Sequence, residues 1–426
     1  MTRSPPGGRL IRRLLVAALL TLAIPPGPAV AQEPCESPWV LEETLRIGSI
    51  DGEVTLTWVR DLQVGPDGDM YVSQGWDHSV AVFGVDGRPR RTIGRAGSGP
   101  GEFGSAPHQL LVRGDTLVVT ERFASHFLNL DGTEVRRVSF RVPVPSEAST
   151  FIPGTPLADG SFLGYRFVSP PIGRFFMAPR VALRRFSATG DVIDTIAVVR
   201  QLPAVEIEAL GDEYFDHMAR SHPLADWWSG SGESWLPVTA TKDGSAVVFI
   251  GDVRNDGDWA RFQLLKIGIE GDTLVDRRVA YEPRRITSSE REQVREGFAA
   301  ALAGDFLGSR GVRPPLARAA RLRQAARRAL SFPDSYPPVR QIVTGSDGSI
   351  WLLRASAPTP ADVWEIHGPD GTLEGSVRIS EGRTGPEPWA PRLRIFRATR
   401  DEVWGTTIGD FDVPYLHRYR VDRTCR

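Results

Sequence analysis

The stretch VGPDGDMYVSQGWDHSVAVFGVDGRPRRTIGRAGSGPGEF, residues 64–103, contains two consecutive hairpin patterns. Each pattern places an Asp-Gly pair, at Asp67-Gly68 and at Asp86-Gly87, between short runs of apolar residues. Asp-Gly between such runs is a strong hairpin signal, because glycine adopts the positive φ of a tight turn without steric cost. Two successive hairpins predict a small antiparallel sheet of four strands.

The same pattern returns along the chain, which indicates an internal repeat. Its first hairpin recurs at residues 110–119, 156–165, 238–249, 342–353 and, most degraded, 394–405. Five of the six copies continue into a second hairpin, whereas the last copy ends after its third strand. Four-stranded sheets repeated in this way predict the blades of a β-propeller.

A spare strand at the N-terminus completes this count. Residues 39–47 (WVLEETLRI) have a strand pattern and precede the first full repeat. We therefore predict an all-β fold, a six-bladed β-propeller closed by an N-terminal strand in the last blade.

The two cysteines, Cys35 and Cys425, flank the two strands that this closure would pair. A disulfide between them could replace the tight turn that joins the corresponding strands elsewhere, and such a bond persists in an oxidising compartment. The alternative is two unpaired cysteines near the chain ends.

Residues 1–31 have the features of a cleavable signal peptide. A basic start precedes the apolar run at 14–24, which is too short to span a bilayer, and Ala29-Val30-Ala31 gives a cleavage pattern. We expect cleavage after Ala31, a periplasmic or extracellular location, and a mature propeller at residues 32–426 without a membrane span. An uncleaved membrane anchor is the alternative.

Two insertions interrupt the repeat, at residues 201–235 between blades three and four and at 284–338 between blades four and five. The second is predicted to be helical, because Thr287 followed by Glu290 fits a capping box. Pro314-Pro315 is expected to start a second helix. Loops on a rigid scaffold commonly carry binding function.

The stretch at residues 62–103 resembles an NHL repeat. It has the order of that family: a turn, an aromatic strand, Asp-His before an apolar strand, an Asp-Gly turn and a glycine-rich bridge. The later stretch YPPVRQIVTGSDGSIWLL, residues 336–353, looks like secreted bacterial six-bladed propellers related to NHL proteins. The resemblance implies the fold, but such propellers include protein-binding modules, ligand binders and a few enzymes.

The insertions supply the candidate binding residues. Exposed aromatic side chains bind sugars and proteins well, so Trp227 and Trp228 are predicted to contact a ligand, with Asp226 and Glu233 beside them. Arg321 and Arg328, on the predicted second helix, could meet an anionic partner. The alternatives are that the tryptophans pack over the ring and that the arginines form a solvated helix face.

The histidines are the candidate ligands for a metal site. His78 and His126 occupy the same place in successive repeats, so we interpret both as structural. His108, His217 and His222 are the remaining candidates, but their spacing does not form a recognisable ligand set. We therefore predict neither a catalytic residue nor a metal or other cofactor.

These observations favour a binding module for a protein, peptide or carbohydrate. The alternative is a metal-dependent hydrolase or lyase with its site in the central channel, so enzymatic activity stays uncertain and is less favoured. The net charge of −1 gives no electrostatic case for nucleic acid. We expect a monomer.

Overall fold

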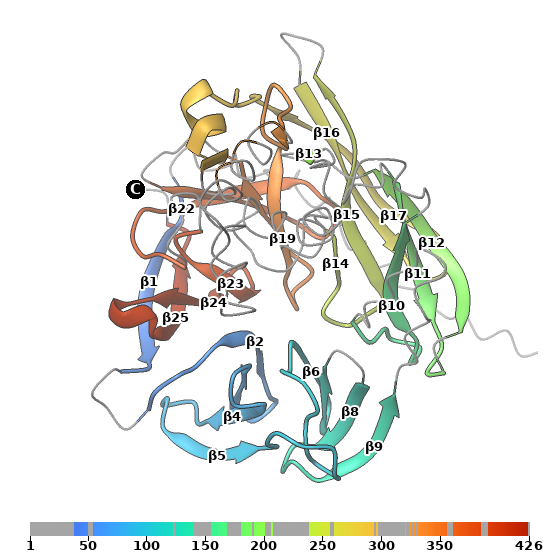
Figure 1. Ribbon diagram of the computed structural model, residues 1–426, viewed down its shortest axis with the longest axis vertical. Helices are drawn as coiled ribbons and strands as arrows, with labels where there is room; N and C mark the ends of the chain where they lie inside the picture. Colours follow the sequence, from blue (N-terminus) through green and yellow to red (C-terminus); the bar gives the residue numbers. More distant parts are fainter. Residues whose placement is uncertain are drawn as a thin grey trace, which may run out of the picture. The chain divides into compact units, whose positions relative to one another are not determined.

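The chain forms six small antiparallel sheets arranged as a six-bladed β-propeller (Figure 1). The computed structural model describes residues 38–49, 54–121, 124–139, 155–167, 180–189, 191–200, 206–207, 238–255, 260–293, 295–296, 320, 324, 328, 330–355, 361–384 and 391–424. Within this part of the chain the predicted fold class is confirmed.

In blades one to five the strands follow one another in sequence, so each of these blades is a meander. Blade one contains β2 (Val59–Val64), β3 (Met70–Gln74), β4 (Ser79–Phe83) and β5 (Pro89–Ile93). Blade two contains β6 (Gln109–Arg113), β7 (Thr116–Thr120), β8 (Ala124–Asn129) and β9 (Glu134–Ser139). Blade three contains β10 (Phe162–Phe167), β11 (Arg180–Phe186) and β12 (Val192–Arg200).

The second half of the ring repeats this plan. Blade four contains β14 (Val238–Ala240), β15 (Ala246–Asn255), β16 (Ala260–Gly268) and β17 (Thr273–Tyr281). Blade five contains β19 (Val339–Thr344), β20 (Ile350–Arg354), β21 (Asp362–His367) and β22 (Leu373–Ile379). Blade six contains β23 (Arg394–Ala398), β24 (Glu402–Ile408) and β25 (Pro414–Asp422), followed by β1 (Val40–Ile47) as its outer strand.

The Asp-Gly turns bring the blades against one another as well as reversing the chain. Gly244, in the first turn of blade four, has a φ of +71°. A Cβ there would lie 2.8 Å from the backbone nitrogen of Ala158 in blade three. Glycine is required at this position for its conformation and for this close approach.

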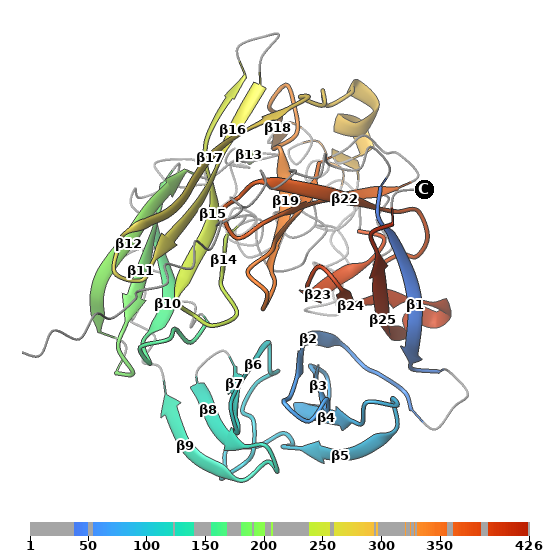
Figure 2. The same cartoon turned by 180° about the vertical axis from the view of Figure 1, so that it is seen from behind.

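The N-terminal strand closes the ring as predicted. β1 pairs antiparallel with β25, from Val40 opposite Asp422 to Ile47 opposite Leu416, and the two strands lie side by side in both views (Figures 1 and 2). Just before β1, the backbone nitrogen of Trp39 donates to the carbonyl of Ser376 in blade five at 2.7 Å. The same N-terminal segment therefore holds two blades together.

Acidification is expected to weaken this closure through His417 of β25. In its neutral form, the imidazole can donate from Nδ1 to the Glu43 carboxylate of β1 (2.7 Å) and accept at Nε2 from the Thr407 hydroxyl (2.8 Å). Burial lowers the pKa of His417 below its usual 6.5, although the Glu43 carboxylate opposes this shift. The unfolded chain then binds more protons, so the free energy of unfolding should fall as the pH drops below about 6.5.

Urea unfolding at a series of pH values, for the wild type and for His417→Gln, measures this effect. The variant should lose the part of the pH dependence that begins near the usual pKa of histidine, because glutamine does not titrate. Parallel profiles for the two proteins would contradict the prediction.

The predicted disulfide partners, Cys35 and Cys425, lie outside the described residues. The pairing of Val40 with Asp422 brings together the described residues nearest to the two cysteines in the sequence, 38–40 and 422–424. We expect a single bridged peptide containing both cysteines when the mature, non-reduced protein is digested and analysed by mass spectrometry. Two thiols that react with an alkylating reagent before reduction would contradict it.

The second insertion begins with the predicted capping box. The backbone nitrogen of Glu290 donates to the Thr287 hydroxyl at 3.2 Å, and the Glu290 carboxylate accepts from the Thr287 nitrogen at 2.8 Å. Residues 288–293 and 295–296 are helical. In the described residues, no helix is both long and apolar enough to cross a membrane.

The two insertions are connected to each other, which the sequence did not predict. Strand β13 (Glu206–Ile207) of the first insertion pairs antiparallel with β18 (Leu330–Ser331) of the second. Four residues after β18, the second insertion also folds back on its own start, because Ser335 forms a bridge with Arg285. Chain segments from both sides of blade four therefore meet in one small sheet.

Candidate functional site

One end of the propeller gathers all the blade-to-blade connections. Because neighbouring strands in a blade are antiparallel, each first strand begins, and each fourth strand ends, at the same end of the ring. The turn between the second and third strands lies there too. We call this the connection end. Both insertions leave the ring from it, since they join β12 to β14 and β17 to β19.

The exposed large aromatic side chains of the described chain all lie at the connection end. They are Trp58 before β2 (38% exposed), Trp76 in the turn between β3 and β4 (74%) and Phe411 in the turn between β24 and β25 (85%). These turns belong to blades one and six, which are neighbours because β2 contacts β23. An exposed aromatic cluster of this kind is typical of a ligand-binding surface.

Trp58 and Trp76 form a fixed pair. Their ring centroids are 5.1 Å apart with an angle of 36° between the ring planes. The backbone nitrogen of Gly75 donates to the Trp58 carbonyl at 2.7 Å, and a Cβ on Gly75 would lie 2.7 Å from the Trp58 ring. The guanidinium of Arg60 lies 4.1 Å over the Trp58 ring. The pair is therefore positioned by the turn that carries it.

Side-chain hydrogen bonds brace the same turn. The Thr57 hydroxyl is 3.0 Å from the amide oxygen of Gln74 and 3.1 Å from the Asp77 carboxylate. The Thr57 backbone nitrogen also donates to the Gln74 amide oxygen, at 2.8 Å. These bonds tie the segment before β2 to the turn between β3 and β4.

Backbone strain concentrates in these two turns. Outside glycine, the described residues with positive φ are His78 (50°), Phe411 (55°) and Asp412 (58°). Histidine and aspartate adopt this conformation more readily than most residues, whereas a bulky residue such as Phe411 does so rarely and must be held there by the surrounding structure. The imidazole Nδ1 of His78 is 3.3 Å from the Phe103 carbonyl. Strain and exposed aromatic rings thus coincide at the connection end.

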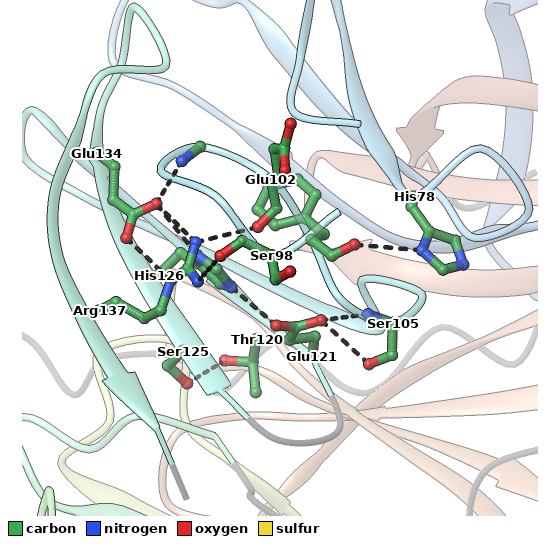
Figure 3. Close-up of polar contacts among 12 residues, drawn as sticks. His78, Ser98, Glu102, Ser105, Thr120, Glu121, Ser125, His126, Glu134 and Arg137 are labelled. Atoms are coloured by element: carbon green, nitrogen blue, oxygen red, sulfur yellow. Dashed lines mark hydrogen bonds and ion pairs between the residues drawn. The ribbon is translucent and has the colours of Figure 1, made fainter. Parts of the chain in front are cut away.

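A second cluster surrounds the other repeat histidine, His126, which is fully buried (Figure 3). Its Nε2 is 3.0 Å from the Glu121 carboxylate and its Nδ1 is 3.5 Å from the Glu134 carboxylate. Phe103 packs edge-on against the imidazole, with 5.0 Å between ring centroids. Two carboxylates beside a histidine could serve acid–base chemistry, so their other partners decide the interpretation.

Those partners belong to the glycine-rich connection between blades one and two. Glu134 accepts from the Gly101 nitrogen at 2.6 Å, and Arg137 donates to the carbonyls of Ser98 and Gly99 (Figure 3). Burial alone would raise the pKa of Glu134, but the Gly101 and Arg137 hydrogen bonds hold it below its usual value. The cluster therefore fastens residues 94–104 to blade two, and we interpret His126 as structural.

On the other side of the imidazole, the Glu121 carboxylate is also held by hydrogen bonds. Burial would raise its pKa, but hydrogen bonds from His126 and from the backbone and hydroxyl of Ser105 hold the pKa below its usual value. The Ser105 hydroxyl lies 3.1 Å from this carboxylate. In the part of the chain that the structure describes, no group of three or more His, Cys, Asp or Glu is arranged to hold a metal.

Charged side chains also connect blades. Lys242, in the turn between β14 and β15, is half-buried, and its Nζ donates to the Phe396 carbonyl of blade six at 3.2 Å. Burial lowers its pKa, while the Asp61 carboxylate of blade one opposes this shift. Asp61 accepts from the Leu110 nitrogen of blade two at 2.7 Å. These charges link four blades.

Most of the predicted binding residues lie outside the described residues: Trp227, Trp228, Asp226, Glu233, Arg321 and the histidines His217 and His222. Arg328 is described, and it is helical and exposed. His108 precedes β6, and its backbone nitrogen donates to the Thr120 carbonyl at 3.0 Å. Sequence reasoning missed Trp58, Trp76 and Phe411. The available signal was an aromatic residue in the segment that follows the second strand of a repeat, such as Trp76 in GWDH, residues 75–78, and Phe411 in GDFDV, residues 409–413.

The fold and this surface define a six-bladed β-propeller with exposed aromatic residues at its connection end. No protein family matches the sequence. No curated protein matches it either.

Several solved structures are similar to it. One is a Bacteroides fragilis protein that its name presents as exported, with 10% identity, coverage of 92% of this chain and 97% of that chain, and a TM-score of 0.43. Another is a member of the DUF4221 family from Bacteroides vulgatus, with 10% identity, coverage of 91% and 99%, and a TM-score of 0.42. A third is virginiamycin B lyase from Staphylococcus aureus, with 12% identity, coverage of 87% and 86%, and a TM-score of 0.35.

Proposed function

We propose that this chain is an exported propeller that binds a protein, peptide or carbohydrate ligand at its connection end. The observation that carries the proposal is the exposure of aromatic side chains on hydrogen-bonded turns of two neighbouring blades, with Phe411 held at positive φ in one of these turns. Rigid aromatic side chains give large contact area at low entropic cost, which is what a binding surface requires. Both insertions leave the ring from the same end.

The proposed export rests on residues 1–31, whose composition fits a cleavable signal peptide. The alternative of a metal-dependent hydrolase or lyase is not proposed, because no arrangement of residues in the described chain favours it. The Glu121–His126–Glu134 cluster, which comes nearest to such chemistry, is occupied by the connection between two blades.

Arrays of immobilised peptides and glycans, incubated with the purified mature protein, test the proposal. The wild type should retain at least one array ligand, and the double variant Trp58→Ala/Trp76→Ala should bind it about tenfold more weakly, a loss of about 1.4 kcal/mol. The matched control is Val192→Ala/Ile193→Ala, which removes exposed apolar side chains at the opposite end of blade three. An array ligand bound equally by wild type and double variant would contradict the proposal, as would no bound ligand.

A further inference from the structure

We infer that the Trp58–Trp76 pair binds a sugar ring of an uncharged oligosaccharide or polysaccharide. This inference rests on the proposed function and specifies the ligand class of the same site. The first step is the shape of the pair. Trp76 is 74% exposed and packs at 36° against Trp58, which is 38% exposed and lies under the Arg60 guanidinium, so Trp76 provides most of the accessible indole surface of the pair. The apolar C–H face of a sugar ring matches an indole of this kind.

The second step is the polarity of the surroundings. The side chains fixed beside the two indoles are polar: the Thr57 hydroxyl, the exposed Asp77 carboxylate and the Arg60 guanidinium. Sugar hydroxyls both donate and accept hydrogen bonds, so they suit a rim that offers an acceptor and donors together. A hydrophobic side chain of a bound peptide would instead need a deeper apolar pocket around the two rings.

The third step is charge. Asp77 is negative and Arg60 is positive, so the immediate rim carries no net charge. A polyanion such as a phosphorylated or sulfated ligand would meet the Asp77 carboxylate, and a cationic peptide would meet the Arg60 guanidinium. An uncharged ligand is repelled by neither the Asp77 carboxylate nor the Arg60 guanidinium.

The fourth step is preorganisation. Asp77 is held by the Thr57 hydroxyl, and Trp58 is held through its carbonyl by the Gly75 nitrogen. A ligand therefore does not have to order these groups when it binds, which lowers the entropic cost of a weak, stacking-dominated contact. On the neighbouring blade, Phe411 is a further exposed aromatic side chain at the same end, and we expect only the longer saccharides to reach it.

Isothermal titration calorimetry with three neutral hexasaccharides, cellohexaose, maltohexaose and hexa-N-acetylchitohexaose, tests the inference on the mature protein. At least one should bind, and Trp76→Ala should weaken its binding about tenfold. Trp76→Tyr, which keeps an aromatic face, should lose less. Phe411→Ala should weaken binding of the hexasaccharide more than binding of the corresponding disaccharide.

The controls separate this inference from the proposed function. Val135→Ala removes an exposed apolar side chain from blade two and should leave the titration unchanged. Absence of binding to all three hexasaccharides, or binding that Trp76→Ala leaves unchanged, would overturn the sugar inference. Binding that weakens steeply as salt is added would also overturn it, because it would show an ionic contact. If peptides are retained on the array through Trp58 and Trp76 while the hexasaccharides do not bind, the inference fails and the proposed function stands.

Discussion

Trp39→Ala is expected to lower the free energy of unfolding by about 3–5 kcal/mol, the usual cost of deleting a buried tryptophan side chain. Trp39 is 8% exposed and packs in the apolar cluster that joins blades five and six, with Val377 and Val421 among its members. Its indole also lies over Gly375, where a Cβ would approach it to 2.4 Å. Removing it leaves a cavity where the N-terminal segment joins two blades.

Urea unfolding followed by circular dichroism measures this loss. Trp76→Ala is the matched control, because it deletes the same side chain from a position that is 74% exposed, and it should cost only about 1 kcal/mol, for the lost contact with Trp58. Gly375→Ala should also destabilise the protein, since the new methyl group would displace the Trp39 indole. A loss of less than about 1 kcal/mol in the free energy of unfolding of Trp39→Ala would show that the contact between Trp39 and blade five does not stabilise the protein.

The blades could be predicted because their turns are local. An Asp-Gly pair between apolar runs specifies a hairpin within about ten residues, and the count of strands then required the N-terminal strand to complete blade six. The capping box at Thr287 and Glu290 is local too. The contact of Trp39 with blade five could not be predicted, because a residue before a strand carries no sign of a third partner. The β13–β18 pairing, two residues long, has no pattern to detect.

The candidate site was harder to predict for a related reason. Trp227 and Trp228 were predicted to bind a ligand because they are adjacent in a segment with the composition of a loop. Trp58, by contrast, lies between Leu56 and Val59, both buried, and a run of this kind resembles core. Its exposure depends on the path of the chain into β2, where the pairing with β3 is irregular between Val59 and Leu62. Such an irregularity follows from tertiary packing and leaves no mark in the local sequence.

Asp61→Ala is expected to lower the free energy of unfolding by about 2–4 kcal/mol. The Asp61 carboxylate accepts from the backbone nitrogens of Leu62 (2.8 Å) and Leu110 (2.7 Å). Alanine would leave these amide donors without this acceptor between blades one and two, and an unpaired buried donor costs about 1–3 kcal/mol. Asp61→Asn keeps only one of the two acceptor oxygens and turns its NH2 group toward the other backbone donor, so it should cost at least half as much.

Lys242 separates the hydrogen-bonding contribution of Asp61 from its charge. The ammonium group and the carboxylate attract each other, while Lys242 itself bonds to the Phe396 carbonyl in blade six. In a Lys242→Met background, Asp61→Ala should therefore cost less by about 0.5–1 kcal/mol, the coupling expected for a pair that stays partly solvated. A double-mutant cycle from urea unfolding measures this difference. Equal costs in the two backgrounds would show that Asp61 joins the blades only through its hydrogen bonds, and that the two charges act independently.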